Sequence, residues 1–154
     1  MITRQLTIED CQAVAHLETQ LFDGRFDAAG LRALLGKPAF YGALLPAPDM
    51  PTTIHAYCLA YITSMQADII AIGTEKTKQG RGFGQIILQH LIDMTEQNNV
   101  AEITLEVAAD NIAARRLYDS CGFHVSGIRK DYYYRGENRS DAVIMVRQRD
   151  SAFP

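Results

Sequence analysis

The hydrophobic positions of this chain recur with two different periods, which together predict an alternation of helices and strands. Apolar residues spaced three and four positions apart predict helices over residues 8–21, 27–35, 85–98 and 112–120. Short β-branched or alternating runs predict strands over residues 2–6, 40–45, 53–63, 67–74, 102–107, 124–128 and 142–147. We therefore expect a single mixed α/β domain over residues 1–154, with a largely antiparallel sheet of about seven strands flanked by about four helices.

Local signals refine these boundaries. Thr7 is a suitable N-cap for the first helix, and acidic residues at positions 9 and 10 suit its first turn. Prolines at positions 46, 48 and 51 predict a loop without regular structure over residues 46–51. The buried stripe of the first helix is predicted to be Ile8, Cys11, Val14, Leu17 and Leu21. That of the helix near residue 90 is predicted to be Phe83, Ile86, Ile87, Leu91 and Met94.

A glycine-rich loop, KTKQGRGFG at residues 76–84, lies between a predicted strand and a predicted helix. Its glycines let a ligand approach the backbone, and the helix start offers unpaired N–H groups that favour a phosphate or pyrophosphate. Lys76, Lys78 and Arg81 add positive charge beside it. The loop has neither the GxxxxGK[ST] pattern of a P-loop nor the GxGxxG pattern of a dinucleotide fold. A plain solvent-exposed glycine loop is the alternative interpretation.

A second set of candidate residues lies in the segment LEVAADNIAARRLYDSCGF at residues 105–123. The preceding strand alternates sharply, so Glu106 faces away from its apolar neighbours and can accept a proton directly or through water. Tyr118 lies two helical turns after Asn111, on the same stripe of the helix. Each residue also has a purely structural interpretation: a solvent-facing carboxylate, a helix cap and a core tyrosine.

Taken together, these segments resemble the GNAT family of N-acetyltransferases. The resemblance rests on the pattern Q-x-x-G-x-G at residues 79–84 and on L-E-V-x-x-x-N-x-x-A-x-x-L-Y-x-x-x-G-F at residues 105–123. It implies the GNAT fold, acetyl-CoA as co-substrate and no metal. It also implies Glu106 as the general base for the attacking amine and Tyr118 as the general acid for the CoA sulfur.

The same resemblance implies how acetyl-CoA is held. Backbone groups of Ile72, Gly73 and Thr74 are expected at the thioester and pantetheine, where a main-chain N–H can steady developing negative charge. Asn111 and Tyr118 are expected to contact the pantetheine arm as well. The residues expected at the pyrophosphate are Gly80, Arg81, Gly82, Phe83, Gly84 and Gln85.

Within the family, RKDYY at residues 129–133 and DAVIM at residues 141–145 resemble the bacterial enzymes that acetylate the N-terminal alanine of ribosomal proteins. The implied partner is a protein N-terminus, that of a small-subunit ribosomal protein. Lys76, Asp110 and Ser140 depart from the common pattern on the acceptor side. An acetyltransferase for a small amine or a lysine side chain therefore stays open as an alternative.

Two further questions stay open at this point. The tyrosines at positions 132, 133 and 134 can form a wall for a peptide, or they can only pack a hairpin. A non-catalytic acyl-CoA-binding module would keep the same fold, although it would need neither Glu106 nor Tyr118. The oligomeric state is not indicated by any pattern in the chain.

Composition and charge narrow the class of protein. A net charge of −3 argues against direct nucleic-acid binding, so the positive charges near the glycine loop suit one anionic ligand. The three cysteines and four histidines are scattered without metal-ligand or disulfide spacing, and we interpret the histidines as structural. No apolar run approaches the roughly 20 residues of a membrane span, and the N-terminus has no signal-peptide pattern. We expect a cytoplasmic protein without a membrane partner.

Overall fold

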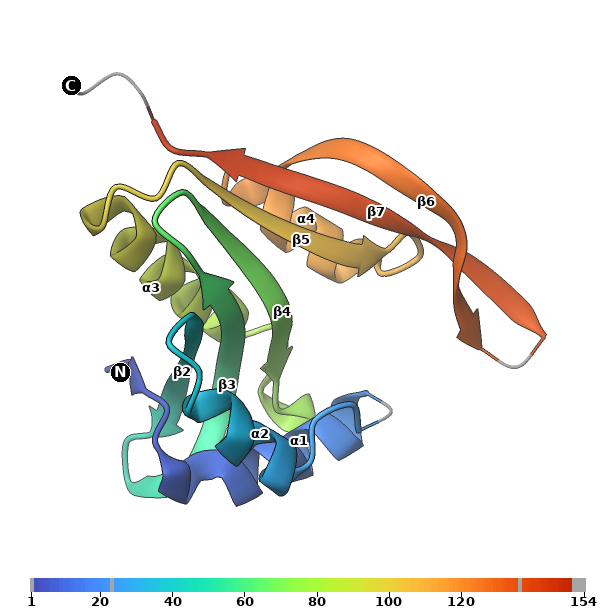
Figure 1. Cartoon of the computed structure of the whole chain (residues 1–154). Coiled ribbons are helices and arrows are strands. Elements are labelled where there is room, and N and C mark those ends of the chain that lie inside the picture. The colour runs from blue at the N-terminus through green and yellow to red at the C-terminus, as the bar shows by residue number, and fades with distance from the viewer. Residues whose placement is uncertain (1, 23, 136, 151–154) are drawn as a thin grey trace.

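The computed structural model describes residues 2–22, 24–135 and 137–150, and in this part of the chain seven strands form one twisted sheet (Figure 1). The strand order is β1-β2-β3-β4-β5-β7-β6. The strands are β1 (Arg4–Gln5), β2 (Phe40–Ala47), β3 (Met50–Ile62), β4 (Gln66–Thr74), β5 (Glu102–Ala108), β6 (His124–Arg135) and β7 (Asn138–Gln148). The helices are α1 (Cys11–Leu21), α2 (Ala28–Leu35), α3 (Phe83–Gln97) and α4 (Ile112–Ser120), with 3-10 turns η1 (Ile8–Asp10) and η2 (Lys76–Lys78). The predicted fold class is confirmed.

Two strands in the middle of the sheet run parallel and then separate. β4 and β5 pair only from Gln66 opposite Glu102 to Ile69 opposite Leu105, whereas the other neighbouring strands are antiparallel. Beyond Ile69 and Leu105 the two strands diverge, as Figure 1 shows. The sheet therefore opens into a gap near its centre, bordered by the ends of β4 and β5.

Each face of the sheet has its own hydrophobic core. One core joins α3 and α4 to the sheet, and it includes Ile87, Leu91, Leu105 and Tyr118. The other core joins α1 and α2 to β2, β3 and β4, and its fully buried members include Cys11, Leu31, Tyr57 and Leu59. The prediction that Cys11 is a core residue is confirmed.

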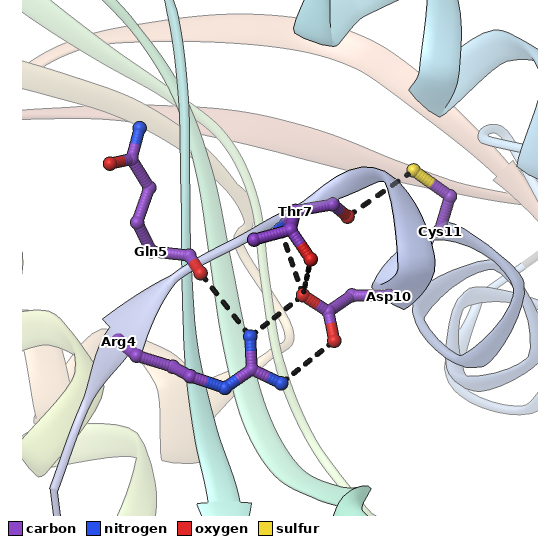
Figure 2. A network of polar contacts seen from close by, with 5 residues as sticks. All are labelled: Arg4, Gln5, Thr7, Asp10 and Cys11. Carbon is purple, nitrogen blue, oxygen red and sulfur yellow. Dashed lines mark hydrogen bonds and ion pairs between the residues drawn. The ribbon is translucent and has the colours of Figure 1, made fainter.

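The start of the chain is tied to α1 by a polar network, shown in Figure 2. The Asp10 carboxylate accepts hydrogen bonds from the Thr7 backbone N–H at 2.8 Å and from the Thr7 hydroxyl at 3.0 Å. Arg4 donates to both Asp10 oxygens at 2.7 and 2.8 Å, and it also reaches the Gln5 carbonyl at 3.3 Å. The Cys11 thiol donates to the Thr7 carbonyl at 3.8 Å. Thr7 is an N-cap as predicted, but it caps the short turn η1 rather than α1 itself.

Two predicted segments differ in the structure. Pro46 and Pro51 lie within β2 and β3, so the expected loop at 46–51 shrinks to a tight turn at residues 48–49. The pairing is irregular on both sides of Pro46, and such bulges accommodate a residue without an N–H. The segment between the predicted strands at 124–128 and 142–147 is also mostly strand, because β6 and β7 pair again from Tyr133 opposite Ser140, after a bulge. The side chains of this hairpin are mostly polar, so the alternation of apolar and polar positions that indicates a strand is absent from its sequence.

Two residues of the predicted helical stripes are exposed. Ile8 is 57% exposed because it lies in η1, ahead of the helix, and Ile86 is 38% exposed because α3 turns Leu88 and Ile92 toward the core instead. His90 lies on α3 and binds two side chains, with Nδ1 at 2.7 Å from Thr3 Oγ1 and Nε2 at 2.8 Å from Tyr41 Oη. This agrees with a packing role for His90. Over the ranges the structure covers, no helix combines the length and apolar character that a membrane crossing requires.

Candidate active site

A cavity of about 500 Å³ lies where β4 and β5 separate, within the size range of ordinary small-molecule sites. Four parts of the chain form its walls: the end of α1, the end of β4, the glycine loop with the start of α3, and one face of α4. The lining residues are Leu21, Phe22, Ile72, Gly73, Thr74, Gln79, Gly80, Gly82, Phe83, Gly84, Gln85, Asn111, Ala113, Ala114, Leu117 and Tyr118. Segments far apart in the sequence thus meet at one gap in the sheet.

The edge of β4 offers backbone hydrogen-bonding groups to this gap. Tyr57 on β3 and Gly73 on β4 are cross-strand partners. Two positions further along the chain from Gly73, the Glu75 N–H donates a hydrogen bond to the His55 carbonyl at 2.9 Å. Hydrogen-bonded pairs alternate along an antiparallel ladder, so Gly73 uses its N–H and C=O on Tyr57. The residues on either side of Gly73 therefore turn theirs away from β3.

Ile72 and Thr74 are those neighbours, and the strand edge they present is not covered by β5. The Gln79 side chain donates to the Thr74 carbonyl at 3.1 Å, which shows that a donor from outside the sheet reaches this edge. An extended ligand with amide groups could pair with the same edge as a further strand would. Ile72 and Thr74 are thus suited to the predicted role, whereas Gly73 contributes through packing.

The glycine loop adopts the conformation that its sequence suggests. Gly80 and Gly82 have φ angles of 76° and 84°, in the left-handed region that favours glycine. An added Cβ at either glycine would have no atom within 4 Å, so the space beside the loop is open. Gly82 is the N-cap of α3, and no acidic residue lies in the first turn of that helix. The free N–H groups and the helix dipole suit an anionic phosphate group.

The start of α4 supplies Asn111, and its second turn supplies Tyr118. The Asn111 side-chain oxygen accepts a hydrogen bond from the Ala114 N–H at 3.2 Å, so Asn111 is a helix cap and also lines the cavity. Tyr118 is only 5% exposed and its ring lies 5.9 Å from that of Phe123. Burial raises the pKa of the Tyr118 phenol well above its ordinary value, which keeps the hydroxyl protonated.

Glu106 lies on β5 but does not line this cavity. Its neighbours Leu105 and Val107 belong to the core beside α4, so strand alternation turns Glu106 toward the opposite face. There its Oε1 lies 3.3 Å from the Arg129 guanidinium. Burial raises the pKa of Tyr133, and the Glu106 charge adds to the rise, so this phenol lies within electrostatic reach of Glu106.

Two tyrosines of β6, Tyr132 and Tyr133, lie near Arg129 and Glu106. Arg129 lies over the Tyr132 ring at 5.5 Å, and the Tyr132 and Tyr133 rings meet edge to face at 5.2 Å. The side chain of Tyr134 is outside the part of the chain that the structure describes. Asp131, with a φ of 50°, lies within the bulge of β6 between Arg129 and Tyr133, and its N–H donates to the Asp141 carboxylate at 2.9 Å. Arg129, Tyr132 and Tyr133 are thus gathered beside Glu106.

The structure brings together nearly all of the predicted acetyl-CoA residues. Ten of them line the cavity, and Arg81, which is exposed on the loop, does not. The cavity also includes Leu21 and Phe22 at the end of α1, which sequence reasoning missed because no pattern links that region to the glycine loop. Gln79 and Leu117, also missed, stand within the two motifs and could have been found from their positions there. In the described ranges no group of three or more His, Cys, Asp or Glu residues is placed to hold a metal ion.

This chain belongs to the acetyltransferase (GNAT) family, whose family model matches residues 12–123. Among particular relatives, the [ribosomal protein bS18]-alanine N-acetyltransferase of Escherichia coli is 39% identical over 91 residues. That match covers 59% of this chain and 62% of the relative, so it spans less than two thirds of the relative's length. The N-alpha-acetyltransferase RimI of Mycobacterium tuberculosis is 34% identical, with 97% of this chain and 92% of the relative covered.

Solved structures show the same fold. The crystal structure of the ribosomal-protein-S18-alanine N-acetyltransferase from Escherichia coli superposes with a TM-score of 0.85 at 28% identity, and covers 96% of this chain and 92% of that chain. Arabidopsis thaliana NAA60, crystallised in complex with acetyl-CoA, superposes with a TM-score of 0.81 at 13% identity, and covers 96% of this chain and 97% of that chain. At that identity, the second likeness shows the fold alone.

Proposed function

We propose that this protein is an acetyl-CoA-dependent Nα-acetyltransferase that modifies the N-terminal amine of a protein. The observation that carries the proposal is the gap between β4 and β5, where the free edge of β4, the glycine loop, Asn111 and Tyr118 line one cavity. The space beside Gly80 and Gly82 is open, and the Tyr118 phenol on the cavity wall is buried, which supports a bound phosphate at the loop and a protonated hydroxyl at Tyr118. The acceptor is inferred from relatives named for acetylation of a ribosomal protein or an N-terminus, and we propose a small-subunit ribosomal protein with N-terminal alanine.

Acetyl-CoA supplies the acetyl group as a thioester. In the proposed reaction Glu106 accepts the proton that the amine loses, directly or through water, as nitrogen forms a bond to the carbonyl carbon. Tyr118 gives its proton to the sulfur as the carbon–sulfur bond breaks, and it regains a proton afterwards from solvent. The N–H groups on the free edge of β4 favour negative charge on the carbonyl oxygen. The products are the N-acetylated amine and CoA.

The two proposed proton-transfer residues suit these roles by their surroundings. Tyr118 is buried and stays protonated at neutral pH, as a proton donor must. Glu106 has a partly exposed side chain beside Arg129, where a peptide can reach it. The wall of Arg129, Tyr132 and Tyr133 next to Glu106 supports an extended acceptor rather than a small amine.

Transfer from acetyl-CoA to matched peptides tests the proposal. Three peptides share one sequence beginning with Ala: one with a free N-terminus, one with a blocked N-terminus, and one blocked but with an internal lysine. We expect acetylation of the free N-terminus only, located by tandem mass spectrometry. Modification of the lysine or of free polyamines alone would refute the Nα assignment. Acetyl-CoA binding without transfer to any amine would favour the non-catalytic module instead.

A further inference from the structure

A buried pair of polar side chains lies behind the gap, on the α1 side of the sheet. Glu18 on α1 and Tyr57 on β3 are both fully buried. The Tyr57 hydroxyl donates a hydrogen bond to Glu18 Oε1 at 2.5 Å. Burial, together with this hydrogen bond, raises the pKa of Tyr57 far above its ordinary value, so the hydroxyl remains a donor.

The pair is costly if its purpose is only to fill the core. Glu18 Oε2 is buried and has no hydrogen-bond partner in the described part of the chain. A buried polar atom without a partner opposes folding, and two apolar side chains of similar volume would pack the same space without that cost. The position of Tyr57 relative to β4 gives another reason to keep the pair.

Tyr57 packs directly against Gly73, in the β4 segment that lines the cavity. The two residues are cross-strand partners. A Cβ placed on Gly73 would lie 2.8 Å from Tyr57 Cε1 and 2.8 Å from Leu21 Cδ1, so the ring and α1 both press on this glycine. Leu21 follows Glu18 by three positions on the same helix and lines the cavity. Glu18 therefore links the end of α1, the Tyr57 ring and Gly73 into one packed unit.

We propose that Glu18 and Tyr57 are a positioning pair for acetyl transfer. The Glu18 carboxyl holds the Tyr57 hydroxyl, and the fixed ring sets the height and tilt of Gly73. The flanking residues Ile72 and Thr74 then present their backbone groups to the thioester at a defined place. This role rests on the proposed acetyl transfer, but it makes a separate claim about the β4 backbone, which is testable without an acceptor.

The test uses variants that separate positioning from stability. Tyr57→Phe removes the hydrogen bond and leaves Glu18 unpaired, which can weaken folding. The double variant Glu18→Leu with Tyr57→Phe removes both polar groups, so it should fold at least as stably as the wild type. Tyr41→Phe is the matched control. Tyr41 lies on the same sheet but away from Gly73, and the variant removes a hydroxyl that lies 2.8 Å from His90 Nε2.

We expect the double variant to bind CoA within about twofold of the wild type and to transfer acetyl groups about tenfold more slowly. The single variant Glu18→Gln keeps a side-chain oxygen that accepts the hydrogen bond from Tyr57. It should therefore retain most of the wild-type transfer rate. Tyr41→Phe should transfer at the wild-type rate. A double variant that folds and transfers as fast as the wild type would overturn the proposal.

Amide NMR signals give the second measurement. In the ligand-free protein, the signals of Ile72 and Thr74 should shift in the double variant and stay in place in Tyr41→Phe. Unchanged signals in the double variant would overturn the positioning role even if its rate fell. If the wild type acetylates no N-terminus, the proposed function fails, and the NMR comparison still decides whether the pair positions β4.

Discussion

Glu106 and Tyr118 lie on opposite sides of β5. Tyr118 packs in the core beside α4 together with Leu105 and Val107, whereas Glu106 faces the open side, next to Arg129. The proposed proton acceptor and proton donor therefore lie on opposite faces of the sheet. This arrangement predicts that each residue can be removed without disturbing the site of the other.

Replacing Glu106 by Gln should leave acetyl-CoA binding unchanged and slow acetyl transfer by about 100-fold or more, because the amine loses its proton acceptor. Stopped-flow transfer rates and calorimetric affinities would measure the two effects. Glu102→Gln is the matched control, since Glu102 lies on the same strand and face, four residues away. A Glu106→Gln rate equal to that of Glu102→Gln would show that Glu106 takes no part in proton transfer.

Replacing Tyr118 by Phe should slow transfer and also change stability at alkaline pH. The pKa of Tyr118 is raised by burial above its ordinary value of 10.0. The folded protein therefore keeps the proton that the unfolded chain loses, and stability falls as the pH rises above about 10. In Tyr118→Phe the free energy of unfolding should fall less steeply with pH than in the wild type, by up to about 1.4 kcal/mol per pH unit. Urea unfolding of the wild type and the variant over roughly pH 9 to 11.5 measures this difference. Identical pH dependences of stability in the two proteins would contradict the prediction.

Replacing Gly82 by Ala should weaken acetyl-CoA binding at least about tenfold, because the new Cβ enters the open space where we propose that the pyrophosphate binds. The left-handed backbone at Gly82 also makes Ala strained, by about 1 kcal/mol. Gly122→Ala is matched for this strain, since Gly122 has a φ of 89° but lies outside the cavity. Thermal unfolding should show similar losses in both variants, and calorimetry should show weaker binding only for Gly82→Ala. Equal acetyl-CoA affinities of Gly82→Ala and Gly122→Ala would show that the glycine loop does not bind acetyl-CoA.

Replacing Asp10 by Asn should cost about 1.5 kcal/mol of stability at neutral pH, because Arg4 and Thr7 lose a charged acceptor. Burial alone would raise the pKa of Asp10, but hydrogen bonds from Arg4 and Thr7 outweigh it and hold the pKa below its ordinary value of 3.8. The stabilisation is therefore complete above that pH and is lost as the pH falls through the lowered pKa. Wild type and variant should converge in acid, as followed by urea unfolding. Asp93→Asn, on the exposed face of α3, is the matched control and should change stability at neutral pH little.

The motifs predicted the cavity-lining loop and helix because both depend on local chemistry. Gly80 and Gly82 take positive φ angles that glycine permits, and Asn111 caps α4 through its own side chain. Predictions failed where neighbours outweigh local preference. Pro46 is held in β2 beside an irregular ladder, and the polar hairpin of β6 and β7 is held by pairing rather than by a buried face.

The sequence alone determined the order of helices and strands, the glycine loop and the family pattern, since each depends on residues close together in the chain. Only the tertiary structure decided that Glu106 and Tyr118 face opposite sides of the sheet, that Leu21 and Phe22 reach the cavity, and that Glu18 and Tyr57 support Gly73. The physical reason is the parting of β4 from β5 after Ile69 and Leu105, a long-range event of sheet twist and packing that no local pattern encodes.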